Sequence, residues 1–205
     1  MVTKQERRNK IKTRIRGKVS GTAERPRMTV FRSNKQIYVQ LVDDSEGKTL
    51  ISASSKGMEE GTKTELAAKV GQAIAEKALA AMVDRANEDI FGLDYYKRYG
   101  YIAADVEGES VSKTLEYAYD DWCIARMAEK MGKNEIANEF YRRAQYYKNL
   151  YDPETKFFRG RKNGGFVTPF DPTQVNFMLT EANTWQYNFF VPQDVNTHID
   201  MMGGM

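Results

Sequence analysis

An abrupt change of composition near Ala80 constrains this chain of 205 residues more than any other feature. Of its 24 aromatic residues only Phe31 and Tyr38 precede the change, whereas both tryptophans, the one cysteine and the one histidine follow it. Residues 1–80 hold 17 Lys and Arg against 9 Asp and Glu, and residues 81–205 hold 14 against 19. A cationic part therefore precedes an acidic, aromatic part, which predicts two domains with separate cores.

Composition also excludes several classes of protein. The single cysteine, Cys123, allows no intramolecular disulfide, and the single histidine, His198, argues against a zinc site. No apolar stretch approaches the roughly 20 residues of a membrane span, and Met1 to Lys18 lacks the apolar segment of a secretory signal. We expect a cytoplasmic chain with no membrane partner and no metal ligands.

A basic arm occupies residues 4–18, which carry eight cations and one acid in the sequence KQERRNKIKTRIRGK. Like charges at this density repel each other, so we expect the arm to stay unfolded until a polyanion neutralises it. Ile11 and Ile15 lie one helical turn apart and favour a helix in the neutralised state. A solvated basic tail is the alternative.

Strands and a helix are predicted after the arm. Beyond Gly21 and Pro26, alternating residues predict strands at 28–31, 36–42 and 49–53. Apolar residues then recur every four positions from Leu66 to Ala86, which predicts one helix that crosses the change of composition. The expected order is arm, antiparallel strands, helix.

Two segments of this first part carry a family resemblance: SGTAERPRMTVFRSNKQIYVQLVDDSEGKTLISAS and TKTELAAKVGQAIAEKA. They resemble the eighteenth large-subunit protein of bacterial ribosomes, a family that binds 5S rRNA. The resemblance implies that the arm and the polar faces of the strands contact 5S rRNA and large-subunit rRNA, since cations neutralise phosphates and release counterions. The residues implied are Arg7, Arg8, Lys10, Lys12, Arg14, Arg16, Lys18, Arg25, Arg27, Arg32, Asn34 and Lys35.

One part of that family's pattern does not follow. The family continues with a further strand, a glycine-rich loop and a closing helix, which this sequence does not show. We therefore expect a ribosomal α/β module over residues 1–81 that is truncated at its carboxyl-terminal end. Its sheet should keep an open edge.

Helical periodicity dominates the second part. It predicts a helix from about Val111 to Met131 capped by Ser110 or Ser112, and a second helix that is capped by Asn134 and runs through about Leu150. A hairpin is expected around Asn163 and Gly164. Tetratricopeptide repeats have a similar helix-pair texture, but a repeat scaffold needs about three such units and one is present.

A second resemblance covers residues 82–205, through DIFGLDYYKRYGYIAAD, EGESVSKTLEYAYDDWCIARMA, RAQYYKNLYDPETKFFRGR, PFDP and TEANTWQYNFFVPQD. These segments resemble glycoside hydrolase family 92, whose members are calcium-dependent, inverting exo-α-mannosidases. The resemblance implies a mainly α-helical fragment of an (α/α)6 barrel, truncated at both ends, and hence an α+β class for the whole chain. Calcium belongs to that family, and we expect no cofactor in this chain.

The resemblance also implies a catalytic residue. Glu181 matches the family's general acid, and a carboxyl shielded by Trp185 and Tyr187 would keep the proton that the leaving oxygen needs. Trp185 is the expected substrate contact. Inversion requires a second carboxylate roughly 6.5–9.5 Å away, and the resemblance places that base beyond Met205.

Neighbouring carboxylates do not replace that base. Asp120 and Asp121 lie on a helix that the resemblance treats as scaffold. The sequence thus leaves enzymatic activity undecided and favours its absence, with an α-mannoside glycan as a partner only if the hydrolase part is completed.

Three hypotheses for function remain at this point. The first is a 5S rRNA-binding part fused to an inactive hydrolase fragment. The second is an exo-α-mannosidase, and the third is a non-functional fusion. Binding of 5S rRNA and hydrolysis of mannosides discriminate between them.

Overall fold

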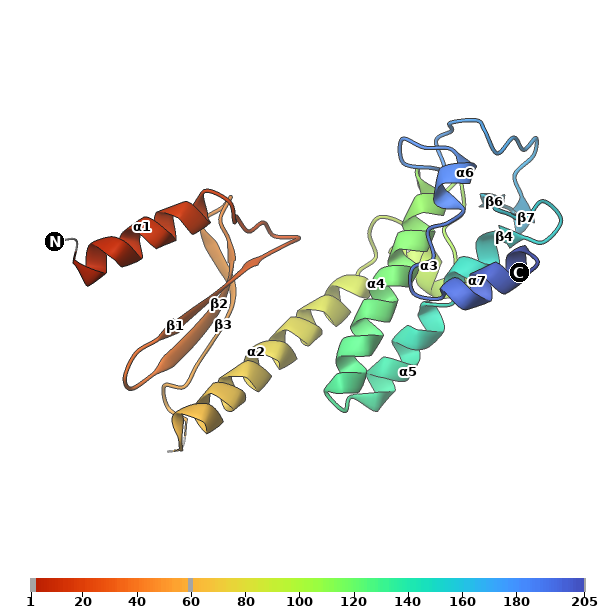
Figure 1. Ribbon diagram of the computed structural model, residues 1–205. Coiled ribbons are helices and arrows are strands. Elements are labelled where there is room, and N and C mark those ends of the chain that lie inside the picture. Colours follow the sequence, from red (N-terminus) through yellow and green to blue (C-terminus); the bar gives the residue numbers. More distant parts are fainter. Residues whose placement is uncertain (1–2, 59–60, 205) are drawn as a thin grey trace. The chain divides into compact units, whose positions relative to one another are not determined.

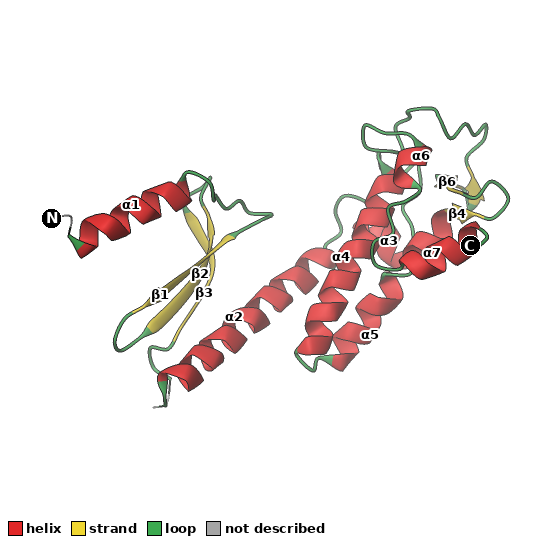
Figure 2. Ribbon diagram, in the orientation of Figure 1, coloured by secondary structure: helices red, strands yellow, loops and turns green. Residues whose placement is uncertain are grey.

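The computed structural model describes residues 3–58 and 61–204 and consists of helices and small antiparallel sheets (Figures 1 and 2). It separates into two compact units, unit 1 over residues 1–80 and unit 2 over residues 81–205. The division falls where the composition changes. No helix in the described ranges is both long and apolar enough to cross a membrane.

Unit 1 contains one three-stranded antiparallel sheet in the order β1-β2-β3. Strand β1 covers Arg27–Arg32, β2 covers Ile37–Asp43 and β3 covers Lys48–Ser54. The three predicted strands are confirmed to within one residue at each end. Helix α1 (Lys4–Arg16) precedes the sheet and helix α2 (Lys63–Ala86) follows it.

The core of unit 1 lies between α2 and one face of the sheet. Val39 of β2 packs with Val70 and Ile74 of α2, and residues of β2 and β3 surround them. Met28 and Val30 share this face because they pair with Leu41 and Val39, yet their side chains are 62% and 54% exposed. The core therefore covers β2 and β3 but leaves β1 as an open edge with uncovered apolar side chains.

The basic arm is the helix α1, so the expectation that it needs a polyanion to fold is wrong. Thr3 and Glu6 form a capping box, in which the Glu6 backbone N–H donates to the Thr3 hydroxyl at 3.2 Å and the Thr3 N–H donates to the Glu6 carboxylate at 2.7 Å. Every residue of α1 is exposed, so water and salt screen the repulsion between its cations.

Asp44 holds the carboxyl-terminal end of α1 on the sheet. Its carboxylate accepts bidentate hydrogen bonds from Arg16, at 2.8 and 2.9 Å, and from Arg27, at 2.7 and 2.9 Å. The Gly21 N–H donates a fifth bond at 2.8 Å. Hydrogen bonds from the guanidinium groups of Arg27 and Arg16 hold the pKa of this carboxyl well below its usual range. Figure 1 shows α1 meeting the strands only at this end.

Gly21 allows the chain to approach the strands closely at this point. Its carbonyl accepts from the Asp44 N–H at 2.9 Å, and a side-chain carbon at position 21 would collide with the Val42 carbonyl oxygen and the Arg27 nitrogen. The segment between α1 and β1 is thus held by backbone and side chain of one residue, Asp44.

Helix α2 runs without a break from Lys63 to Ala86, as predicted, and so crosses from unit 1 into unit 2. Its last turn belongs to unit 2, where the Arg143 guanidinium donates to the Ala86 carbonyl at 3.0 Å and to the Asn87 side chain at 2.9 Å. A cation at the end of a helix satisfies carbonyls that lack a partner in the helix itself.

Unit 2 is built on an antiparallel pair of helices, α4 (Ser110–Lys130) and α5 (Asn134–Arg143). The αα-hairpin is confirmed, but the predicted caps are wrong. Glu109, in a left-handed conformation, and Lys133 hold the N-cap positions of the two helices. The second helix also ends earlier than predicted and continues as a 3₁₀ turn, Tyr146–Leu150.

Short elements complete unit 2. They are α3 (Leu93–Tyr99), β4 (Tyr151–Asp152), β5 (Phe157–Phe158), β6 (Arg161–Lys162), β7 (Gly165–Phe166), α6 (Thr184–Tyr187) and α7 (Val195–Met202). Strands β6 and β7 form the predicted hairpin, with Asn163 and Gly164 at φ 50° and 79° in its turn.

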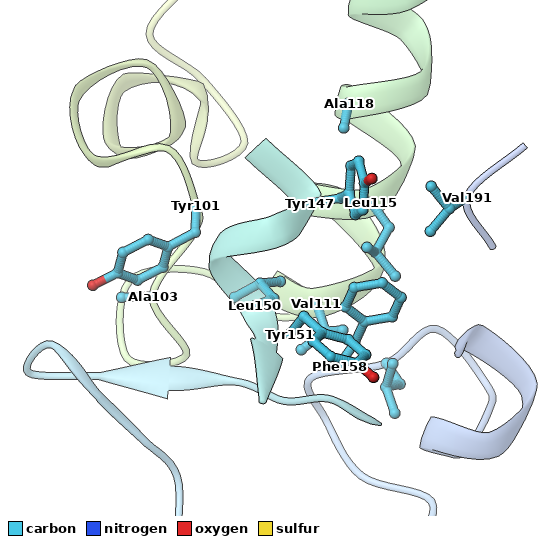
Figure 3. Close-up of a cluster of buried hydrophobic side chains, with 11 residues drawn as sticks. Tyr101, Ala103, Val111, Leu115, Ala118, Tyr147, Leu150, Tyr151, Phe158 and Val191 are labelled. Carbon is cyan, nitrogen blue, oxygen red and sulfur yellow. The ribbon is translucent and has the colours of Figure 1, made fainter. Parts of the chain in front are cut away.

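Aromatic side chains fill the core of unit 2 (Figure 3). Leu115 and Ala118 of α4 pack with Tyr147 of the 3₁₀ turn and Phe158 of β5. The rings of Tyr147 and Phe158 meet edge to face, with centroids 6.2 Å apart. This cluster shares no residue with the core of unit 1, so the prediction of separate cores is confirmed.

A buried ion pair joins α3, α4 and α5. Asp121 and Arg143 are 2% and 3% exposed and lie 3.0 Å apart, and the Tyr96 hydroxyl donates to Asp121 at 2.8 Å. Burial raises the pKa of Asp121 to about 6, while Arg143 and Tyr96 oppose the rise. Removing one partner would leave an uncompensated buried charge.

His198 generates a prediction about the pH dependence of stability. It is 4% exposed, its Nε2 lies 2.6 Å from the Asn188 carbonyl oxygen, and its buried Nδ1 has no hydrogen-bond partner in the part of the chain that the structure describes. Burial lowers its pKa. Neutral His198 therefore contributes its full stabilisation of the folded state above the unfolded pKa of about 6.5. This contribution is lost as the pH falls through the lower pKa of the folded state.

We expect the contribution of His198 to the free energy of unfolding of unit 2 to fall by at most about 1.4 kcal/mol per pH unit below about pH 6.5, while the raised pKa of Asp121 acts in the opposite direction in both proteins compared. Urea unfolding followed by tryptophan fluorescence measures it, because Trp122 and Trp185 both lie in unit 2. His198→Gln should show a smaller loss between pH 7 and pH 5. Equal losses in both proteins would contradict the assignment.

The interactions of Asp44 predict that Asp44→Asn releases the arm. An amide cannot hold two arginines as an anion does, so amide hydrogen exchange over residues 4–20 should speed up markedly. Exchange in β2 should change little, because Asp44 follows that strand. Asp84→Asn, a change of the same kind at a residue of α2, is the matched control. Unchanged exchange in the arm of Asp44→Asn would show that other contacts position α1.

Candidate functional site

Helix α1 presents a dense array of cations. Six of them are exposed and form no ion pair with a carboxylate of residues 3–58 or 61–204: Lys4, Arg7, Arg8, Lys10, Lys12 and Arg14. The one acid of the helix, Glu6, is used in the capping box. The helix thus offers unneutralised positive charge to a polyanion.

A second group of polar residues lies at the turn between β1 and β2. Ser33 organises this turn, because its hydroxyl accepts from the Gln36 N–H at 3.0 Å and from the Lys35 N–H at 3.3 Å. Arg32, Asn34 and Lys35 are all exposed there. The turn therefore points two cations and one amide toward solvent.

The structure separates the predicted RNA-binding residues into two groups. Ten of the twelve are exposed and form no ion pair within the described ranges: Arg7, Arg8, Lys10, Lys12, Arg14, Lys18, Arg25, Arg32, Asn34 and Lys35. Arg16 and Arg27 are instead held by Asp44. Their first role is structural, since they fix the arm relative to the sheet.

Sequence reasoning missed three residues of this surface. Asp44 lies between the predicted strands 36–42 and 49–53, and no local pattern marks its role, because its partners lie 28 and 17 positions away in the sequence. Phe31 and Tyr38 were assigned to strands without a role, yet they are 59% and 36% exposed. Their alternation with Val30 and Val39 was the available signal that they face away from the core.

Unit 2 places the candidate acid of a hydrolase, Glu181, on an exposed loop before α6. Its backbone is left-handed, with φ 48°, a conformation that is uncommon for a residue with a side chain. Trp185 is 49% exposed and packs edge-on against Phe157 with centroids 4.6 Å apart. The Tyr187 hydroxyl donates to Glu116 at 3.1 Å.

One cavity of unit 2 lies away from Glu181 and Trp185. It has a volume of about 280 Å³ and is lined by residues that include Arg159, Phe170 and Asp171, but by neither Glu181 nor Trp185. Asp152 holds the cavity-lining side chain of Arg159 in place through an ion pair at 2.6 Å. The residues expected to act on a sugar are thus outside the cavity.

Two carboxylates of unit 2 are engaged by neighbouring side chains. Asp121 is engaged by Arg143 and Tyr96, and Asp194 accepts from the Tyr147 hydroxyl at 2.9 Å. Within the described part of the chain, no three His, Cys, Asp or Glu residues are grouped so as to hold a metal ion.

Comparison with known proteins identifies two sets of relatives. Large ribosomal subunit protein uL18 of Porphyromonas gingivalis is 56% identical over 104 residues, and that of Bacteroides thetaiotaomicron is 59% identical over the same length. Each match covers 50% of this chain and 91% of the relative. The matched stretch is longer than residues 4–80, so its end aligns with residues that fold in unit 2.

The second set consists of glycoside hydrolases. The sequence model described as "Glycosyl hydrolase family 92 catalytic domain" matches residues 10–205. A family GH92 α-mannosidase of Bacteroides thetaiotaomicron is 47% identical with a TM-score of 0.61, and an inverting mannosidase of that family and organism is 39% identical with a TM-score of 0.60.

Coverage differs sharply between the two sets. Each α-mannosidase match covers 63% of this chain but only 18% and 19% of the solved chains, respectively. The chain thus spans nearly the full length of its ribosomal relatives and less than a fifth of the hydrolases. It belongs to two families, as a chimera of large ribosomal subunit protein uL18 in its amino-terminal part and of the glycosyl hydrolase family 92 catalytic domain in its carboxyl-terminal part.

Proposed function

We propose that unit 1 binds 5S rRNA and that the chain associates through it with large-subunit rRNA in the cytoplasm. The observation that carries the proposal is the group of exposed cations on α1, which form no ion pairs among the described residues and stand on a helix that Asp44 holds to the sheet. Membership of the uL18 family supports the choice of ribosomal RNA over other polyanions.

The net charge of each unit also indicates which unit contacts the RNA. Residues 1–80 carry a net charge of +8 and residues 81–205 a net charge of −5. Phosphates attract the first and repel the second, and each phosphate that is neutralised releases counterions into solution. Unit 2 should therefore stay outside the RNA interface.

The ribosomal module ends within α2 in this proposal, over residues 1–81. Unit 1 has three strands in one sheet, and the residues after Ala80 fold with unit 2. A module with an open edge at β1 and exposed Met28 and Val30 should be less stable than one whose sheet is covered.

Removing charge from the arm should weaken binding of 5S rRNA and flatten its salt dependence. For Arg7, Arg8 and Arg14→Ala together, the slope of log affinity against log salt should lessen by about 2 to 3, since about 0.7 to 0.9 is lost per phosphate contact. Filter binding to 5S rRNA transcribed in vitro, between about 50 and 300 mM salt, measures the slope.

A matched variant controls for net charge. Arg98, Lys130 and Lys133→Ala removes three exposed cations from unit 2 and should leave both affinity and slope unchanged. If the arm variant behaves as wild type, α1 does not bind the RNA. If both variants weaken binding equally, net charge alone accounts for it.

Unit 2 is proposed to be an inactive fragment of a family 92 catalytic domain, with neither calcium nor glycan as a partner of this chain. Glu181 is exposed to water and lies outside the cavity, whereas a general acid needs a positioned partner and shielding from solvent. The two buried carboxylates, Asp121 and Asp152, are bound to arginines and so are unsuited to activate a water.

Accordingly, the 205-residue chain should release no mannose from an aryl α-mannoside, with or without millimolar calcium. Glu181→Gln, which cannot donate a proton, sets the background, and wild type should match it from about pH 5 to pH 8. Calcium-dependent release that disappears in Glu181→Gln would contradict the proposal and identify unit 2 as an active α-mannosidase.

A further inference from the structure

The only two aromatic residues of unit 1 lie outside its core. Phe31 and Tyr38 are the sole aromatics among residues 1–80, and the core cluster is formed by Val39, Val70 and Ile74 instead. Aromatic side chains usually supply much of the buried area of a small domain. Their exposure, 59% for Phe31 and 36% for Tyr38, therefore requires an explanation.

The two rings form a pair on the face of the sheet opposite α2. Phe31 and Tyr38 are direct partners in the β1–β2 register, and their ring centroids lie 6.3 Å apart at an angle of 43°. We call this surface the open face; its other members in the register are Arg27, Thr29, Gln40, Val42, Ser52 and Ser54. None of these side chains is acidic.

A cation borders the aromatic pair. The turn after β1 contains Lys35, which is exposed without an ion pair in the described ranges, whereas Arg32 pairs with Ile37 and so belongs to the face that α2 covers. An exposed aromatic pair with polar neighbours, placed beside phosphate-binding charge, has the components of a stacking surface for nucleobases. A purely apolar protein partner would not match this charge.

We propose that Phe31 and Tyr38 stack against unpaired bases of RNA, so that unit 1 recognises a loop or bulge of 5S rRNA and not only its duplex segments. The inference rests on the proposed function, because it concerns the same unit and the same RNA. Bases in a duplex are already stacked on each other, and only unpaired bases offer a free face to aromatic side chains. The arm supplies phosphate contacts, and the aromatic pair discriminates single strands from duplex.

The test uses the full chain and 5S rRNA, with Phe31→Ala and Tyr38→Ala combined. Affinity should fall about tenfold or more, because stacking of each base contributes substantially to binding. The slope of log affinity against log salt should stay that of wild type, since no phosphate contact is removed. A change of affinity at constant slope distinguishes this variant from the arm variant above.

Two matched variants accompany it. Met28→Ala with Val30→Ala removes exposed apolar groups from the other face of the same strand and should bind as wild type. Phe31→Tyr with Tyr38→Phe keeps both rings and should retain binding to within about twofold, which separates loss of the rings from disturbance of the fold.

A defined probe tests the preference for single strands. A 12-nucleotide single-stranded RNA should lose about tenfold in affinity for the double alanine variant, and the duplex of the same sequence should lose none. If wild type binds 5S rRNA and the double alanine variant binds it equally well, the inference is wrong while the proposed function stands. Equal losses for single strand and duplex also overturn it. A third result would also overturn it: the double alanine variant self-associates more weakly than wild type in sedimentation but binds RNA equally well. That result would assign the aromatic pair to a protein contact.

Discussion

The arrangement of unit 1 depends on one carboxylate, that of Asp44. Five hydrogen bonds from Arg16, Arg27 and Gly21 converge on it and join residues far apart in the sequence. Without this convergence α1 would be a charged helix with no buried residue and no fixed position. Asp44 thus converts a mobile polycation into an oriented one, which lowers the entropy that binding must still remove.

The same interaction separates the arginines of unit 1 into those paired inside the protein and those that stay exposed. Arg16 and Arg27 are neutralised inside the protein, whereas Arg7, Arg8 and Arg14 stay free to meet phosphate. Asp44 therefore neutralises the arginine at the carboxyl-terminal end of α1 and leaves the cations of the preceding turns unneutralised. The aromatic pair of the open face adds chemistry that charge alone cannot supply, because phosphates look alike in every RNA and unpaired bases do not.

Helix α2 is the one element that the two units share. Its first half covers the sheet through Val70 and Ile74, and its last turn is held by Arg143 in unit 2. Arg143 in turn binds Asp121, so the end of the helix is tied to a buried network. Each unit keeps its own core, and α2 runs across the boundary between the two units.

Local patterns predicted the strands, α2 and the helical hairpin because each depends on neighbours in the sequence. The arm was predicted wrongly as unfolded, since the count of like charges ignored the capping box of Thr3 and Glu6 and the distant Asp44. The predicted caps of α4 and α5 were wrong because Glu109, which is left-handed, and Lys133, which has a negative φ, replace the serine and asparagine that short-range preference favours. The exposure of Glu181 depends on packing around a loop, which no local pattern reports.

Mapping of cross-links between the full chain and 5S rRNA tests the central claim most directly. Ultraviolet irradiation of the complex followed by mass spectrometry identifies the peptides that touch RNA. The account predicts cross-linked peptides within residues 4–38, including those that contain the arm and the aromatic pair, and none within residues 81–205. Cross-links concentrated in unit 2, or none in the arm despite a stable complex, would contradict it.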